Sequence, residues 1–554
     1  MANETVKTTP TPESMLSKGI TPITGTFIQP WLYNSYTDAD WEKEFAIWKE
    51  FGIEYLIMGD TVSMNMETLS IETSYPSQIE GAKILDDVMT KLFLKCKIHG
   101  IKLYVGMGNT AGGWPYLDFL KPGNAEKFKR ICEKFAVIAE DMYNIYYKDY
   151  PETFFGFYFV PELYNSSAFD NDASRATYVS GLSGGINIIL DKINSLNPNL
   201  PFLFSPYVNL FGGDWVSKNF DNISKFWCEY LATANFRDGD TICPQDSVGA
   251  GGCDLTLLDS MSNAYKKAVD NCGKKIKFYS NCEIFMQPKG DFFGEKNFPT
   301  WSGCTTERMT EQFKIVSKYV ERIFVFSVPH YLSNVNAANG YYDSYMYFLE
   351  NGAIERELPT PPNKFRTAFT KIDGKKCLSI YWSGMYDNIG VHRVNIYKNN
   401  EFFTFRIPVQ KIGSNGKLIY QNNFFDLTFT PDTTKPATYE FEVIDCAGNV
   451  SERSSFTVNP ETVPNKQILD PFYKGPTDNS TGDESSNANN SEATSSTESN
   501  AESANESNQS ADSSATESDS NKKGSSKPWI YGGIAVGTIA IAATAFAIFK
   551  HKKK

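Results

Sequence analysis

Two glutamates, each just after a short strand-like run, are the residues of this sequence best suited to carry out chemistry. Glu162 follows the run Phe154–Val160, and Glu283 follows the run Lys275–Asn281. Both runs contain apolar and aromatic residues that are typical of strands. Cleavage of a glycosidic bond needs one acid to protonate the leaving oxygen and a second group to attack or to activate water. The pair therefore indicates that chemistry, provided that both strands end on one face.

The elements that must position the glutamates alternate between strand-like and helix-like segments. Eight such units in roughly 330 residues predict a (β/α)8 TIM barrel of the α/β class with long loops after its strands. A doubly wound sheet usually carries a glycine-rich phosphate loop, and this sequence contains none. The expected strands are 23–29, 54–58, 101–107, 154–160, 201–205, 241–244, 275–281 and 322–327, and the expected helices are 40–51, 81–99, 124–147, 178–195, 214–234, 254–271, 306–320 and 341–349.

Other polar and aromatic residues also follow the predicted strands, at the end of a barrel that holds active sites. Aromatic rings there would stack on a sugar, and polar groups would bind its hydroxyls. Each also has a purely structural interpretation, such as a rim ion pair, a cap or loop packing. Asp60 and Asn109 follow strands as well, and we assign them no role. The candidates for substrate binding are Gln29, Trp31, Trp114, Tyr164, Tyr207, Gln245, Asp246, Asn281 and His330, with Trp301 as a further aromatic.

Four motifs within about 22–351 resemble a family of barrel domains of unknown function that are regarded as candidate glycoside hydrolases. They are Gly25–Trp31, Gly156–Glu162, Pro244–Gly249 and Asn281–Phe285. Glutamates after strands four and seven also resemble the pattern of clan A glycoside hydrolases. The resemblance implies Glu162 as acid/base and Glu283 as nucleophile of a retaining mechanism.

The residue before the first glutamate departs from that pattern. Many clan A enzymes have an asparagine immediately before the acid/base, whereas this chain has Pro161. Asp246 is therefore a rival carboxylate, and an inverting mechanism stays open. Inversion would need carboxyl groups roughly 6.5–9.5 Å apart, against about 5–5.5 Å for retention.

The remainder of the chain predicts a second folded domain, a stalk and an anchor. Short strand-like runs separated by turns predict a small immunoglobulin- or fibronectin-like β-sandwich, with Asp445–Ser451 resembling a hairpin turn of such modules. A Ser-, Asn- and Glu-rich stretch cannot bury enough surface to fold. The expected parts are a disordered N-terminus (1–19), the barrel (20–355), the sandwich (359–460), a disordered stalk (475–527), a transmembrane helix (529–549) and a basic cytoplasmic tail (550–554).

The apolar run 529–549, followed by lysines, predicts one membrane crossing. We therefore expect a single-pass membrane protein with a C-terminal anchor and an extracellular catalytic domain. The N-terminus has no signal-peptide pattern, which leaves a cytosolic, tail-anchored orientation open. The ten cysteines allow five local disulfides or several buried free thiols, and both interpretations stay open.

Charge and composition exclude some function classes. A net charge of −12 argues against nucleic acid as a partner. With four histidines and no Cys/His spacing typical of zinc, we expect no metal and no cofactor. The leading hypothesis is a membrane-anchored glycoside hydrolase acting on a carbohydrate, and the alternative is a catalytically inactive glycan-binding surface protein, an adhesin. The sequence leaves the sugar, the linkage and the oligomeric state open.

Overall fold

The N-terminal two thirds of the chain form a closed barrel of eight parallel strands, which confirms the predicted barrel. The computed structural model describes residues 15, 19–287, 302–336, 340–372, 375–407, 409–412, 418–426, 429 and 435–464. Each barrel strand pairs with the next one along the chain, and the last pairs with the first. The strands are β1 (Ile23–Ile28), β2 (Tyr55–Met58), β6 (Lys102–Gly106), β8 (Phe154–Phe159), β9 (Phe202–Phe204), β10 (Thr241–Ile242), β11 (Lys277–Glu283) and β14 (Arg322–Phe326).

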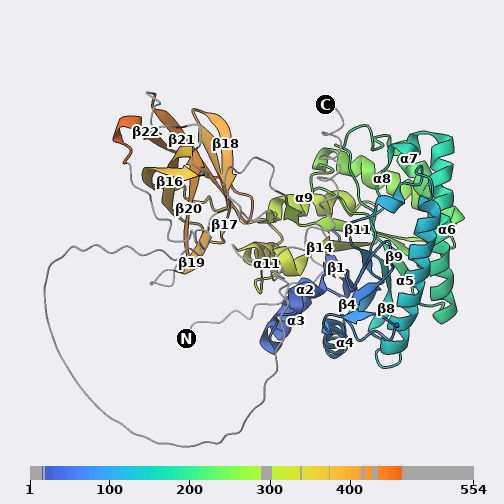
Figure 1. Cartoon of the computed structure of the whole chain (residues 1–554). Helices are drawn as coiled ribbons and strands as arrows, with labels where there is room; N and C mark the ends of the chain where they lie inside the picture. The colour runs from blue at the N-terminus through green and yellow to red at the C-terminus, as the bar shows by residue number, and fades with distance from the viewer. Residues whose placement is uncertain are drawn as a thin grey trace, which may run out of the picture. The chain divides into compact units, whose positions relative to one another are not determined.

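Helices cover the outside of the barrel, as Figure 1 shows for α5, α6, α7 and α8. Their apolar faces pack on the strands, and their charged faces meet solvent. The helices that follow the barrel strands are α3 (Asp38–Phe51), α4 (Val88–His99), α5 (Asn124–Tyr146), α6 (Asp172–Leu196), α7 (Phe220–Thr233), α8 (Leu255–Asn271), α9 (Thr306–Val316) and α11 (Tyr341–Asn351).

Helix α4 begins seven residues later than predicted, because Asp87 caps it. The Asp87 side chain accepts a hydrogen bond from the Thr90 N–H, which satisfies one of the free donors of the first turn. The residues before the cap instead contribute a strand to a small sheet on the barrel rim. This sheet has the order β5 (Lys83–Ile84), β4 (Ile71–Thr73), β3 (Val62–Met64), β7 (Asn109–Thr110), and so it ties together the loops after β2 and β6.

Aromatic side chains fill the barrel interior. Phe27, Tyr55, Tyr104, Tyr158 and Phe324 belong to one buried cluster inside the strands. The Phe27 and Tyr158 rings meet edge to face with their centroids 5.5 Å apart. Since both residues lie near the C-terminal ends of their strands, this layer forms the floor on which any site at that end rests.

The residues after the barrel form two four-stranded antiparallel sheets with a shared apolar core, which includes Trp382, Val394 and Phe441. The sheet orders are β15-β16-β20-β19 and β18-β17-β21-β22. The sequence predicts five strands here, at 377–382, 391–398, 402–408, 424–430 and 439–444, and the structure has β15, β19 and β22 in addition. The assignment to an immunoglobulin-like class and the domain bounds stay predictions. The strands are β15 (Lys364–Ile372), β16 (Lys375–Met385), β17 (Val391–Lys398), β18 (Glu401–Arg406), β19 (Val409–Ile412), β20 (Leu418–Asp426), β21 (Ala437–Asp445) and β22 (Ser454–Val458).

The predicted membrane localisation is wrong by the structure. No helix among the described residues is long and apolar enough to cross a membrane. Even α6, with 25 residues, carries Asp172, Arg175, Asp191 and Lys192, whereas a spanning helix needs about 20 consecutive apolar residues. We therefore withdraw the prediction of a single-pass protein with an extracellular barrel. The span expected at 529–549, the stalk, the tail, Trp301 and nearly all of 1–19 lie outside the described residues.

All ten cysteines are free thiols, and nine of them are buried. The interpretation as five local disulfides is therefore wrong. Burial raises the pKa of Cys243 and Cys282, both of which lie on or beside barrel strands. These thiols behave as small apolar core residues.

Candidate functional site

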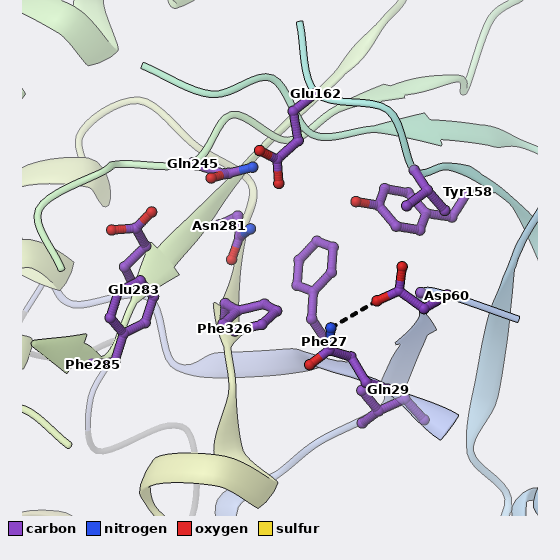
Figure 2. Close-up of a pocket in the computed structure, with 13 residues that line it drawn as sticks. Phe27, Gln29, Asp60, Tyr158, Glu162, Gln245, Asn281, Glu283, Phe285 and Phe326 are labelled. Carbon is purple, nitrogen blue, oxygen red and sulfur yellow. Dashed lines mark hydrogen bonds between the residues drawn. The ribbon is translucent and has the colours of Figure 1, made fainter. Parts of the chain in front are cut away.

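A pocket opens at the C-terminal ends of the barrel strands, and both glutamates line it (Figure 2). In this view the carboxyl groups of Glu162 and Glu283 lie on either side of the Gln245 amide. Five of the sequence-predicted site residues meet here. The pocket is lined by Phe27, Ile28, Gln29, Gly59, Asp60, Tyr158, Val160, Glu162, Gln245, Asn281, Glu283, Phe285 and Phe326.

Glu283 is the last residue of β11 and is almost fully buried. Its Oε2 atom accepts a hydrogen bond from the Ala250 N–H at 2.6 Å. Burial and the negative charge of Asp246 raise the pKa of Glu283, while the N–H groups of Ala250 and Gly249 and the charge of Arg308 oppose the rise. The carboxyl therefore has several partners that stabilise its ionised form.

The loop that supplies these N–H groups approaches Glu283 closely because residue 249 has no side chain. A Cβ atom at Gly249 would lie 2.5 Å from the Phe285 carbonyl oxygen, 2.8 Å from the Glu283 Cβ and 3.1 Å from its Oε2. The first two distances are shorter than Cβ contacts tolerate. Glycine at this position thus permits the contact between loop and carboxylate.

Glu162 follows β8 and is partly exposed in the pocket. Burial of its carboxyl raises the pKa of Glu162 well above its usual range. The neighbouring Gln245 side chain opposes this rise, and the negative charges of Glu283 and Asp60 add to it. Burial thus favours the protonated form of both carboxyl groups, and Glu162 has fewer neighbouring groups than Glu283 to oppose it.

Asp246 supports the site from behind and does not line the described pocket. Its Oδ1 accepts the N–H groups of Glu283 at 3.0 Å and of Val248 at 3.2 Å, and its Oδ2 accepts the Gln312 amide at 2.5 Å. Burial raises the pKa of Asp246, and these donors oppose the rise. The side chain thus holds the end of β11 in place.

Helix α9 supplies the remaining support for this strand end. Arg308 donates through Nη2 to the carbonyl oxygens of Glu283 at 3.0 Å and of Phe285 at 2.6 Å. One turn later, Gln312 donates to the Glu283 carbonyl at 3.3 Å as well as to Asp246. Backbone and carboxyl of Glu283 are therefore fixed from two sides.

The other predicted binding residues lie around the pocket and not among its described lining. Trp31, on the short helix α2 (Pro30–Tyr33), is exposed and packs edge-on against His330, with the two ring centroids 5.2 Å apart. His330 contacts Ser327 through Nδ1, and burial lowers the pKa of His330 to about 4, so its ring is neutral. The Trp114 indole N–H donates to the Asn109 Oδ1 at 2.9 Å. Tyr164 packs on Trp215, with the two ring centroids 5.5 Å apart.

Tyr207 lies near the pocket without belonging to its described lining. Burial raises the pKa of Tyr207, and the charges of Glu283 and Glu162 add to the rise. The hydroxyl therefore stays protonated and responds electrostatically to both glutamates.

Sequence analysis gave no role to Asp60, a third carboxylate that lines the pocket. Its Oδ2 accepts the Gln29 amide at 2.7 Å, drawn in Figure 2, and its Oδ1 accepts the Asn109 amide at 2.9 Å. Asp60 has a positive φ of 52°, which is uncommon for a residue with a side chain. Its position directly after the second predicted strand was the feature of the sequence that could have indicated a place in the pocket.

The aromatic part of the lining was also missed. Phe27, Tyr158, Phe285 and Phe326 line the pocket, but in the sequence they cannot be told from ordinary core residues. Among the described residues, no cluster of three or more His, Cys, Asp or Glu side chains could hold a metal ion.

Comparison with known proteins identifies a family. Residues 23–339 match the family described as Domain of unknown function (DUF4434). This match confirms the resemblance to a barrel family of unknown function. No curated protein matches the chain.

Three solved structures are similar at low identity. The intracellular xylanase TsXylA from Thermoanaerobacterium saccharolyticum is 13% identical over 61% of this chain and 94% of its own, with a TM-score of 0.34. Bacteroides uniformis β-glucuronidase 2 is 10% identical over 79% of this chain and 46% of its own, with a TM-score of 0.34. Chitinase ChiA74 from Bacillus thuringiensis is 10% identical over 79% and 84%, with a TM-score of 0.31. Similarity at this level carries no argument about activity.

Proposed function

This chain belongs to the family described as Domain of unknown function, DUF4434, and from the geometry of its own pocket we propose that it is a glycoside hydrolase with Glu162 and Glu283 as its two catalytic carboxyl groups. The observation that carries the proposal is the pair itself. Two carboxyl groups, both with a raised pKa and with different neighbours, line one pocket at the active end of a barrel. An aromatic floor completes a surface on which a sugar ring can stack.

The surroundings of the two glutamates assign their roles. Burial raises the pKa of both groups. At Glu283 the charge of Asp246 adds to the rise, but the N–H groups of Ala250 and Gly249 and the charge of Arg308 oppose it. At Glu162 the Gln245 side chain opposes the rise, and the charges of Glu283 and Asp60 add to it. Because the two groups interact, they titrate as a pair. One shared proton then resides on Glu162, and Glu283 is the carboxylate.

The reaction follows from this distribution of charge. Glu162 protonates the glycosidic oxygen as the bond to the anomeric carbon breaks, and Glu283 stabilises the positive charge that develops on that carbon. Glu283 then either attacks the carbon or activates a water molecule, and the proton-depleted Glu162 is ready to accept a proton in return. Asp246, Arg308 and Gln312 act as positioning residues, because they hold the Glu283 backbone and do not line the pocket.

The test is hydrolysis of a panel of aryl glycosides and oligosaccharides by wild type and by the variants E162Q and E283Q. We expect each variant to lose at least about 10²-fold in kcat on any substrate that wild type cleaves. E321Q is the matched control. Glu321 precedes β14 and pairs with Lys277, the first residue of β11, at 2.8 Å. Its ion pair is exposed, and losing it costs at most about 1 kcal/mol.

The outcomes separate the hypotheses. Retained activity in E162Q or E283Q on a substrate that wild type cleaves contradicts the assignment. Glycan binding by wild type without any release of reducing sugar favours instead the catalytically inactive, glycan-binding alternative. Circular dichroism and thermal unfolding of each variant establish that its loss of activity is not a loss of fold.

A further inference from the structure

The pocket is acidic. Three carboxyl groups line it, those of Asp60, Glu162 and Glu283. With the shared proton of the pair on Glu162, Asp60 and Glu283 face a ligand as carboxylates. Asn281 also lines the pocket, and its buried Oδ1 has no hydrogen-bond partner among the described residues.

Besides the Tyr158 hydroxyl and the protonated Glu162, the donors of the lining are amides that are mostly engaged. The Gln29 amide donates to Asp60 at 2.7 Å, and the Asn281 amide nitrogen donates to the Ser205 hydroxyl at 3.2 Å. The Gln245 amide nitrogen reaches the Ser205 carbonyl oxygen at 3.4 Å. No lysine, arginine or histidine is found among the described residues that line the pocket.

Arg308 lowers the pKa of Glu283, but its Nη2 atom donates to two carbonyl oxygens and the residue does not line the described pocket. A carboxylate or sulfate on a ligand would therefore enter beside like charges without a cation of the described lining to meet it.

Resting on the proposed glycosidase function, we propose that this pocket takes sugars that bear only hydroxyl or ammonium groups and rejects uronic acids and sulfated sugars. Hydroxyl and ammonium groups can donate to the carboxylates of Asp60 and Glu283. Asp60 is the specificity-determining residue, because its carboxylate lines the pocket and is not one of the two catalytic groups. A sugar ammonium beside this carboxylate gains a charge-assisted hydrogen bond.

The orientation of Asp60 is fixed before any ligand binds. The Gln29 and Asn109 amides hold one carboxylate oxygen each, at 2.7 and 2.9 Å. Asn109 is held in turn by the Trp114 indole N–H at 2.9 Å. Trp114 thus contributes to the pocket from behind, as the last member of a chain of hydrogen bonds.

The experiment measures binding of three matched probes to the full chain by titration calorimetry. They are the methyl thioglycosides of glucose, glucosamine and glucuronic acid, both anomers of each, which resist hydrolysis and differ in one functional group. The buffer is kept mildly acidic so that the amine is charged. We expect the glucuronide to bind at least about tenfold more weakly than the glucoside, and the glucosaminide about tenfold more tightly, a factor that one charged contact supplies.

The variant D60N tests the assigned residue. It keeps an oxygen acceptor but lacks the charge, so we expect the glucosaminide to lose most of its advantage while the glucoside binds within about twofold of wild type. E321Q serves again as control and should bind all three probes as wild type does. A glucuronide that binds as well as the glucoside overturns the inference, and so does an absence of binding by every probe.

These results are independent of turnover. Selective binding without hydrolysis of any glycoside leaves the inference standing and removes the proposed hydrolase. Hydrolysis confined to uronides leaves the proposed hydrolase standing and removes this inference.

Discussion

Replacing Gly249 with alanine tests whether the loop after β10 sets the reactivity of Glu283. The added Cβ would lie 2.5 Å from the Phe285 carbonyl oxygen and 2.8 Å from the Glu283 Cβ, where ordinary contacts begin at 3.4 Å. Residue 249 is not among those with positive φ, so alanine introduces a steric conflict and no backbone strain. To relieve it, loop and strand end must separate by about 1 Å, and overpacking of this kind costs about 1–3 kcal/mol of folding free energy.

The functional cost is of similar size to the structural one. Displacing a catalytic group by about 1 Å lowers the rate on the order of 10²-fold. Separation also weakens the 2.6 Å hydrogen bond from the Ala250 N–H to Glu283, and this bond lowers the pKa of Glu283. The pKa of Glu283 therefore rises further in G249A. Since Glu283 must be ionised to act, the acidic limb of the rate profile moves to higher pH.

The assay is kcat/KM as a function of pH on a glycoside that wild type cleaves, together with thermal unfolding. The matched control is G184A, which makes the same change within helix α6. A Cβ there meets only the flexible end of Lys129, at 3.3 Å, and alanine is favoured over glycine in a helix by up to about 1 kcal/mol. A folded G249A enzyme with wild-type rate and an unmoved acidic limb would refute the reasoning.

Substitutions at Asp246, Arg308 and Glu162 probe the same pair of glutamates. In D246N the negative charge that raises the pKa of Glu283 is gone, and Gln312 can turn its unpartnered Oε1 toward the new amide; we expect the acidic limb of kcat/KM to move to lower pH. In R308M the limb should move to higher pH, because the charge that lowers the pKa of Glu283 is lost, while R308K keeps that charge and should stay closer to wild type. In E162Q, stability should exceed that of wild type by a margin that grows above pH about 4.3, the pKa of an unfolded glutamate. Above that pH the folded wild type binds one more proton than the unfolded chain, because the pKa of Glu162 is raised in the folded state. Wild type therefore loses stability through this group as pH rises, whereas E162Q does not. Chemical unfolding of both proteins at several pH values measures the difference, and an equal pH dependence would contradict the burial argument.

The barrel was predictable because its strands are buried on both faces and therefore consist of continuous apolar runs. The run 154–160 predicted β8 to within one residue of its end. Elements with a weaker pattern were placed less well. The segment before Val88 has no strong period, and only the Asp87 cap shows where the helix begins.

The site was predictable as a set of strand ends but not as a set of side-chain directions. Gln245 and Asp246 are consecutive and were predicted together, yet Gln245 lines the pocket and Asp246 holds the strand from behind. Consecutive residues in an extended chain point to opposite sides, so a shift of one residue decides whether the Gln245 amide or the Asp246 carboxyl faces the ligand. Trp31 and His330 lie on the short helices α2 and α10 (Val328–Tyr331) and outside the described lining, and their part in substrate binding stays a prediction.

The division of labour between the two glutamates could not have come from the strand pattern. In the strand pattern alone Glu162 and Glu283 are equivalent, since each follows an aromatic run, and only the resemblance to clan A enzymes implied separate roles. Burial raises the pKa of both, and their neighbours come from groups far away along the chain. At Glu283 the Ala250 N–H and the Arg308 guanidinium oppose the Asp246 charge, whereas at Glu162 the Gln245 side chain opposes the Glu283 and Asp60 charges. Because donors stabilise a carboxylate and negative charges destabilise it, the proton of the pair belongs on Glu162. Substitutions that remove the donors around Glu283 should therefore raise the pKa of Glu283 and move the acidic limb of kcat/KM to higher pH before they lower the maximal rate.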